Sequence, residues 1–202
     1  MTWLDNALQQ IQEDPTSIRK LFPMATRKAG PEHEAARIKM LAELPDQEEI
    51  PDLYRYGDVN EKRAVILAIA ERNTKDQLLD LARDAFRSND PRLVTASAAP
   101  GIVQNLSDEE ADQLLMKCLF MGIPLDRVPA ITGRSTARTA EMAANFVLER
   151  VCAGRDVSPD VWPIIDQHPP AEVLNQIEEQ LASADPERRK AAAQALNQRG
   201  KV

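Results

Sequence analysis

The chain has 202 residues, of which 43% are hydrophobic and 28% are charged, so it is long enough to fold as one sizeable domain with a solvated surface. A net charge of −7 argues against general nucleic-acid binding, which needs a dense basic surface. Only 4% of the residues are aromatic, so aliphatic side chains and alanine must build the core.

Local sequence patterns predict an all-α fold. Strict alternation of apolar and polar residues nowhere lasts long enough to indicate a strand. Helix starts are marked by capping-box spacings at Thr74 and Ser107, and by capping residues before prolines at 14–15, 90–91, 158–159 and 185–186. The expected helices span residues 2–13, 15–22, 33–44, 47–56, 60–72, 75–87, 91–104, 108–121, 136–153, 159–166, 170–183 and 186–198.

The spacing of these starts favours a repeating architecture. The starts at 74, 90 and 107 are 16 and 17 residues apart, so a helix pair recurs in about 33 residues. This period is typical of stacked helical hairpins, and we predict a HEAT-like α-α superhelix. A compact irregular helical bundle is the alternative. We expect residues 1–202 to form a single all-α domain, with a mobile segment at 25–45 where Gly30 and Pro31 interrupt the pattern.

The first part of the chain has an uneven charge. Residues 15–39 carry six Lys and Arg against two Glu, whereas residues 43–58 carry six acids against Arg55. The two stretches either face each other or solvate separate surfaces, and docking of a partner is a further reading. The opening MTWLDNALQQIQ lacks the pattern of a signal peptide, and no apolar run approaches the ~20 residues of a membrane span. We therefore expect a cytoplasmic protein with no transmembrane segment.

An almost wholly apolar stretch, LLMKCLFM at 114–121, predicts a helix that is buried on every side except at Lys117. The lysine either snorkels to the surface, which we favour, or reaches an internal cavity. Gly122 and Pro124 end this helix. Arg127 and Arg134 follow in the loop, and we expect them to tie the turn to acids on neighbouring helices. A ligand site at this corner is the alternative.

The helix at 136–153 carries an arginine on its apolar side. At 100° per residue, Arg150 projects between Phe146 and Ala143. A buried guanidinium needs an acid, carbonyl groups or a bound anion. In a purely structural interpretation the partner of the Arg150 guanidinium is Asp126 or Asp156. In a functional interpretation the partner is a bound ligand.

Catalytic patterns are nearly absent from the sequence. His33 and His168 lie far apart, and Cys118 and Cys152 form no Cys-x-x-Cys pair and are expected as reduced thiols. The acids of SDEEAD, 107–112, are interpreted as helix capping. Trp162 is either a packing anchor or the aromatic wall of a pocket. We expect no catalytic residue, no metal site and no cofactor.

Four segments together carry a family resemblance: SNDPRL at 88–93, MKCLFMGIPLDRV at 116–128, ITGRS at 131–135 and LERVCAGRDVSPDVWP at 148–163. In order and spacing they resemble the EboA family, α-helical proteins of a bacterial secondary-metabolite gene cluster. The chain is similar to a divergent member, because Thr132 and Leu148 stand where the family has an aspartate and a histidine. By resemblance, the family's polar positions fall on Asn89, Asp90, Lys117, Arg134, Glu149, Arg150 and Arg155.

The resemblance implies a non-catalytic helical binding or scaffold protein acting in biosynthesis or export of a secondary metabolite. Its expected partners are other Ebo-cluster or pathway proteins and a small-molecule metabolite. The alternative is a pathway enzyme that acts on a small anionic or prenylated precursor in a pocket between helices 108–121 and 136–153. DNA binding by a helical stack, as in alkylpurine glycosylases, suits the architecture but not the charge. The candidate ligand-binding residues are Asn89, Lys117, Arg127, Arg134, Glu149, Arg150 and Arg155.

Overall fold

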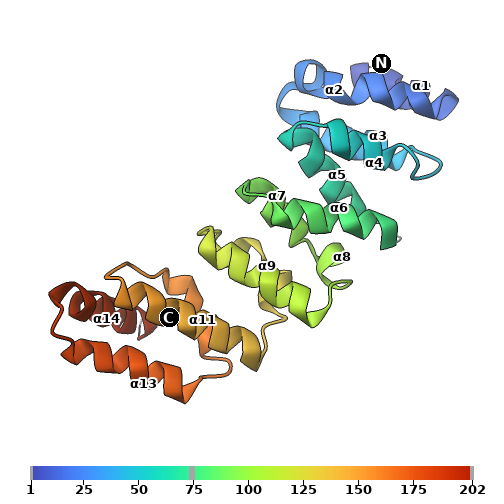
Figure 1. Cartoon of the computed structure of the whole chain (residues 1–202). Helices are drawn as coiled ribbons and strands as arrows, with labels where there is room; N and C mark the ends of the chain where they lie inside the picture. The colour runs from blue at the N-terminus through green and yellow to red at the C-terminus, as the bar shows by residue number, and fades with distance from the viewer. Residues whose placement is uncertain (1, 73–75, 201–202) are drawn as a thin grey trace. The chain divides into compact units, whose positions relative to one another are not determined.

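The structure, a computed structural model, describes residues 2–72 and 76–200. Within those residues the regular elements are α-helices and short 3₁₀ turns, and no strand occurs, which confirms the all-α prediction (Figure 1). The chain divides into two compact units, Met1–Asn105 and Leu106–Val202. We call these the first unit and the second unit and describe each by itself.

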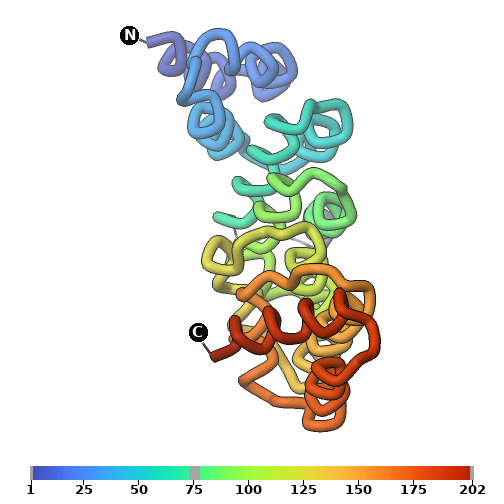
Figure 2. Tube along the Cα trace, turned by 90° about the vertical axis from the view of Figure 1, so that its left-hand side faces the viewer, coloured from blue at the N-terminus to red at the C-terminus, as the bar shows by residue number. Residues whose placement is uncertain are grey.

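The first unit is a succession of helices in which neighbours along the chain pack on one another, as the blue-to-green part of Figure 2 shows. Helix α2 packs on α3, α3 on α5, and α5 on both α6 and α7. Two 3₁₀ turns, Pro15–Ser17 and Gly30–Glu32, precede α2 and α3. The helices are α1 (Trp3–Glu13), α2 (Ile18–Ala29), α3 (His33–Ala42), α4 (Ile50–Tyr56), α5 (Val59–Glu71), α6 (Asp76–Arg87), α7 (Pro91–Ser97) and α8 (Pro100–Val103).

The second unit is organised around its longest helix, α11 (Ala137–Cys152), which packs against α9, α12, α13 and α14. The face of α11 that carries Ala140, Ala143, Val147 and Val151 is buried, as its spacing predicts. Trp162 is fully buried, so it is a packing anchor. The other helices are α9 (Asp108–Phe120), α10 (Pro129–Thr132), α12 (Trp162–Ile165), α13 (Ala171–Glu179) and α14 (Pro186–Arg199).

Most helix starts follow the local rules. The hydroxyl of Ser107 accepts from the amide of Glu110 at 3.2 Å, and the Glu110 carboxylate accepts from the Ser107 amide at 2.9 Å, which confirms that capping box. Prolines open helical turns at 15, 91, 159 and 186, as expected. The capping box predicted at Thr74 lies outside the described residues.

The expected helix at 91–104 is wrong, because the chain is broken there into α7 and α8. Pro100 has no amide hydrogen and disfavours helical geometry at the residue before it. Ala99 is accordingly extended, with φ −66° and ψ 146°. The helix expected at 15–22 instead begins at Ile18 and continues to Ala29 with Pro23 inside it.

The segment 25–45 contains the end of α2, a 3₁₀ turn and α3. Gly30 ends α2 with a positive φ of 55°, which glycine adopts more readily than other residues. The mobility of this segment stays a prediction. The HEAT-like superhelix and the single domain over 1–202 also stay predictions.

Candidate functional site

Helix α9 is less enclosed than its apolar sequence predicts. The ring of Phe120 is 61% exposed and packs edge-on against Phe146 of α11, with ring centroids 4.8 Å apart. The expectation of burial on every side of this helix is therefore wrong at its C-terminal end. Lys117 is partly exposed.

Of the two loop arginines, only Arg134 ties its loop to a neighbouring helix. Its Nη1 donates to the backbone carbonyl of Leu106 at 2.7 Å, and its Nη2 donates to the carboxylate of Asp108, in the first turn of α9. Arg127 is exposed, and its guanidinium has no hydrogen bond or ion pair with the described residues. The predicted tie is thus made at Arg134 and not at Arg127.

Arg150 is partly exposed, and the prediction that its guanidinium enters the apolar core is wrong. Its Nε donates to the backbone carbonyl of Asp156, and its guanidinium lies over the ring of Phe146, 5.6 Å from the centroid. The position lies in the last turn of α11, where a long side chain can leave the packed face and reach the following loop. Of the acids considered, Asp156 is the partner, but through its main chain.

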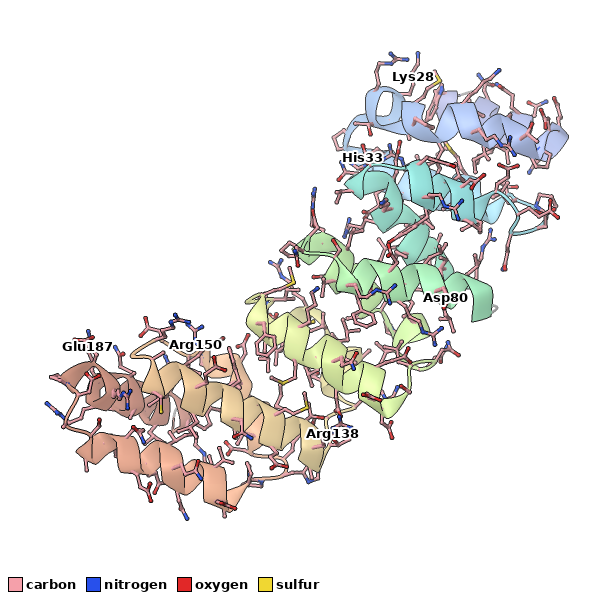
Figure 3. All side chains as sticks on the ribbon, in the orientation of Figure 1. Lys28, His33, Asp80, Arg138, Arg150 and Glu187 are labelled. Atoms are coloured by element: carbon pink, nitrogen blue, oxygen red, sulfur yellow. The ribbon has the colours of Figure 1, made fainter. Side chains whose placement is uncertain are left out.

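The candidate ligand residues of the second unit do not converge. Arg134 precedes α11 and Arg150 lies in its last turn, and a helix of 16 residues is about 24 Å long. Figure 3 shows Arg138 and Arg150 at opposite ends of α11. Glu149 and Arg155 are exposed, and Asn89, also exposed, belongs to the first unit.

A buried carboxylate in the second unit was missed. Asp112 is 3% exposed, accepts a hydrogen bond from the Thr139 hydroxyl of α11, and lies 3.7 Å from Nε of Arg138. Its interpretation as a capping residue is wrong. Asp112 shares a helix face with Leu115 and Leu119, three and seven residues later, and that spacing is the signal that could have placed it.

The first unit buries an arginine completely. The Arg37 guanidinium donates to the Phe22 carbonyl at 3.1 Å, to Thr26 Oγ1 at 2.9 Å and to Glu61 Oε1 at 3.3 Å. Its Nη1 also lies 2.9 Å from Nδ1 of His33, and because an arginine can only donate, this nitrogen is the acceptor.

The sequence held a signal for this buried arginine. Arg37 lies three and four residues before Met40 and Leu41, both fully buried in α3. The helical-wheel argument applied to Arg150 would therefore have placed Arg37 on the apolar face of its helix. A helical wheel shows on which face of the helix a residue's Cβ lies, but not whether the rest of a long side chain stays on that face.

Beside this network lies a cavity of about 340 Å³. Its walls come from α2, α4 and the start of α5, and their apolar part includes Phe22, Pro23 and Leu53. At its mouth Arg19 forms a bidentate ion pair with Glu49, with N···O distances of 2.7 and 2.8 Å. The lining residues are Arg19, Phe22, Pro23, Glu49, Asp52, Leu53, Tyr56, Gly57 and Glu61.

The Arg19–Glu49 pair also bears on the uneven charge of the sequence. Arg19 belongs to the basic stretch 15–39 and Glu49 to the acidic stretch 43–58. At this pair the two stretches face each other, which is one of the two readings that the sequence left open.

Local sequence shapes the wall formed by α4 and α5. A Cβ on Gly57 would lie 2.5 Å from the Leu53 carbonyl oxygen and 2.9 Å from the Glu61 Cβ, so only glycine permits this close turn. Asp58 then caps α5, and its backbone amide donates to Glu61 Oε2 at 2.9 Å. Glu61 is therefore held between that amide and the guanidinium of Arg37.

Metal-binding clusters and membrane-spanning helices are both absent from residues 2–72 and 76–200. No group of three or more His, Cys, Asp or Glu side chains in these ranges is placed to hold a metal ion. No helix there combines the length and the apolar character needed to cross a bilayer.

Comparison with known proteins identifies one family. The family model described as metabolite traffic protein EboA matches residues 6–166, a range that includes the whole cavity lining and all the candidate residues in the second unit. No curated protein matches the chain, and no solved structure matches it.

Proposed function

The chain belongs to the EboA family of metabolite traffic proteins, and from that premise we propose that it is a non-catalytic binding protein whose ligand is a small metabolite. The ligand would occupy the cavity between α2 and α4 in the first unit. The protein would hold the metabolite and pass it on without changing it.

The cavity is the observation that supports this proposal. Ligand sites usually enclose about 300–1,000 Å³ and combine apolar walls with a few polar groups. The cavity of about 340 Å³ has buried apolar walls at Phe22 and Leu53, with the Arg19–Glu49 pair as polar groups. Tyr56 also lines the cavity and is 78% exposed, so the cavity is open to solvent at this residue.

The wider role in this proposal is transfer during biosynthesis or export of a bacterial secondary metabolite, through contacts with other Ebo-cluster or pathway proteins. The family description supports it. Two free cysteines, Cys118 and Cys152, suit a reducing compartment, so we place the role in the cytoplasm. A pulldown of the full chain from cells that make the metabolite tests the partners; recovery of no cluster-encoded protein contradicts this part of the proposal.

The enzyme alternative requires Arg127, Arg134 and Arg150 to hold one anionic substrate near Glu149. Arg134 lies before the start of α11 and donates hydrogen bonds to Leu106 and Asp108. Arg150 lies at the other end of α11 and donates to the carbonyl of Asp156, beyond the end of that helix. No geometry among these residues favours that alternative.

Mass spectrometry of small molecules that co-purify with the full chain tests the binding role. Leu53→Trp fills the cavity, and Tyr56→Ala changes its mouth at a residue too exposed to affect folding. Phe120→Trp introduces the same side chain as the first variant at an exposed position outside the cavity. We expect a co-purifying molecule in the wild type and in Phe120→Trp, and its loss in Leu53→Trp and reduction in Tyr56→Ala.

If no molecule co-purifies, or if all variants retain it equally, the cavity is not the binding site. Far-ultraviolet circular dichroism of each variant separates loss of the ligand from loss of the fold.

A further inference from the structure

We propose that this cavity selects ligands with a neutral or cationic, hydrogen-bond-donating head group beside Asp52 and Tyr56, and that it rejects carboxylates and phosphates. The inference rests on the proposed binding function and gives the chemical class of its ligand. It differs from the sequence-based expectation of an anionic precursor held by arginines.

The charge of the lining supports donor ligands. Three carboxylates, on Glu49, Asp52 and Glu61, line the cavity together with a single guanidinium, on Arg19. Arg19 and Arg37 offset the charges of Glu49 and Glu61, so the carboxylate that an anionic head group would meet is the exposed one of Asp52, and like charges at short range repel one another. An ammonium or hydroxyl head group would instead find acceptors.

The guanidinium that lines the cavity is already neutralised. Both Nε and Nη2 of Arg19 donate to the carboxylate of Glu49, the geometry in which an arginine binds a carboxylate most strongly. Glu49 is buried, whereas the side chain of Arg19 is 64% exposed. A ligand carboxylate could displace Glu49 only by leaving a buried carboxylate without its partner.

Arg37, a buried cation near the cavity, is closed to a ligand. Its guanidinium is fully buried, and its nitrogens are taken up by Phe22, Thr26, His33 and Glu61. Its charge therefore offsets that of Glu61 inside the protein, and Arg37 does not line the cavity.

Besides Arg19, two exposed side chains of the lining suit a donor head group. Asp52 and Tyr56 are four residues apart on α4, so they lie on one face of that helix, and both line the cavity. The side chain of Asp52 is 58% exposed, with Arg55 3.8 Å away as an exposed partner. An aromatic ring beside a carboxylate attracts a cation by two additive effects, the field of the ring and the ionic charge.

Three small probes with the same apolar body separate the possible head groups: 2-phenylethylamine, 2-phenylethanol and phenylacetate, which are cationic, neutral and anionic at pH 7. Ligand-observed NMR of the full chain at low salt suits probes of this size, whose dissociation constants we expect on the order of 1 mM. We expect the amine to bind at least tenfold more tightly than phenylacetate, with the alcohol between them.

Two variants assign the preference to the mouth. Asp52→Asn should weaken binding of the amine about fivefold and leave the alcohol unchanged, because it removes a charge but keeps an acceptor. Asp80→Asn is the matched control: Asp80, labelled in Figure 3, is an exposed acid of the same unit, paired with an arginine three residues later as Asp52 is, and it lies outside the lining. It should leave all three affinities unchanged.

The outcomes distinguish this inference from the function on which it rests. Phenylacetate binding as tightly as the amine, or tighter, overturns the head-group preference and leaves the cavity as a ligand site. An equal effect of Asp80→Asn and Asp52→Asn also overturns it, because net charge alone would then explain the selectivity. Failure of all three probes to bind removes the cavity as a site, and the proposed function with it.

Discussion

Replacing Arg37 by methionine should strongly destabilise the first unit. Methionine keeps an unbranched apolar stem against Phe22 but removes every donor of the guanidinium. Glu61, only 8% exposed, then keeps the Asp58 amide as its donor and loses its cation.

The magnitude follows from the burial of the pair. Removing one member of a buried ion pair costs about 3–5 kcal/mol, and an exposed pair contributes about 1 kcal/mol or less. Because the guanidinium of Arg37 is fully buried, we expect a loss of about 4 kcal/mol in the free energy of unfolding. With a urea m-value of about 2 kcal/mol/M, the midpoint falls by about 2 M.

Urea unfolding of the full chain, followed by circular dichroism at several wavelengths, measures the effect. Arg55→Met is the control, because it breaks an exposed pair with Asp52 in the same unit and should cost about 0.5 kcal/mol or less. Glu61→Gln in the Arg37→Met background should restore about 2 kcal/mol, since the unpaired buried charge is then gone. A loss below about 1 kcal/mol for Arg37→Met, indistinguishable from the control, would refute the reasoning.

Two further predictions concern a thiol and a close backbone contact. Burial raises the pKa of the Cys118 thiol to about 12, so a thiol reagent at pH 8 should modify the partly exposed Cys152 much faster than Cys118 in the folded chain; equal rates would contradict this. Above about pH 9 the Cys118 thiol ionises in the unfolded chain but stays protonated in the folded one. The free energy of unfolding should therefore fall as the pH rises above about 9, which a lower urea midpoint would show. Gly101→Ala would place a Cβ 1.8 Å from the Ala70 carbonyl oxygen, so a loss of about 3 kcal/mol is expected in thermal or urea unfolding. Gly133→Ala is the control, because its Cβ would lie 3.4 Å from the nearest backbone atom, an ordinary contact distance, and it should change stability by less than about 1 kcal/mol. Similar losses for the two variants would contradict the prediction, because the close approach to Ala70 would then not explain the loss at Gly101.

Several elements of this fold were predictable because their causes are local. The capping box at Ser107 and the proline-led starts at 91 and 186 depend on residues within one helical turn. The buried face of α11 follows from spacing alone. The break at Pro100 was equally local, and the chemistry of proline could have predicted it.

The fate of the arginines was not predictable in the same way. The wheel argument placed Arg150 on an apolar face, but its Nε found the carbonyl of Asp156 beyond the end of the helix. Arg37, on an equally apolar face, was overlooked and proves fully buried. The two arginines differ in whether neighbouring helices and loops cover the side chain. The spacing of residues along one helix carries no information about that.

The sequence by itself determined that this chain is helical, where most of its helices start, which faces are apolar and to which family it belongs. Those properties arise from interactions between residues a few positions apart and from the order of short motifs. The tertiary structure alone decided that Arg19 meets Glu49 and Arg37 meets Glu61, contacts that span 30 and 24 residues, and that a cavity lies beside them. Such contacts depend on how α2, α3, α4 and α5 pack, because charge pairing between distant residues is set by the geometry that packing imposes.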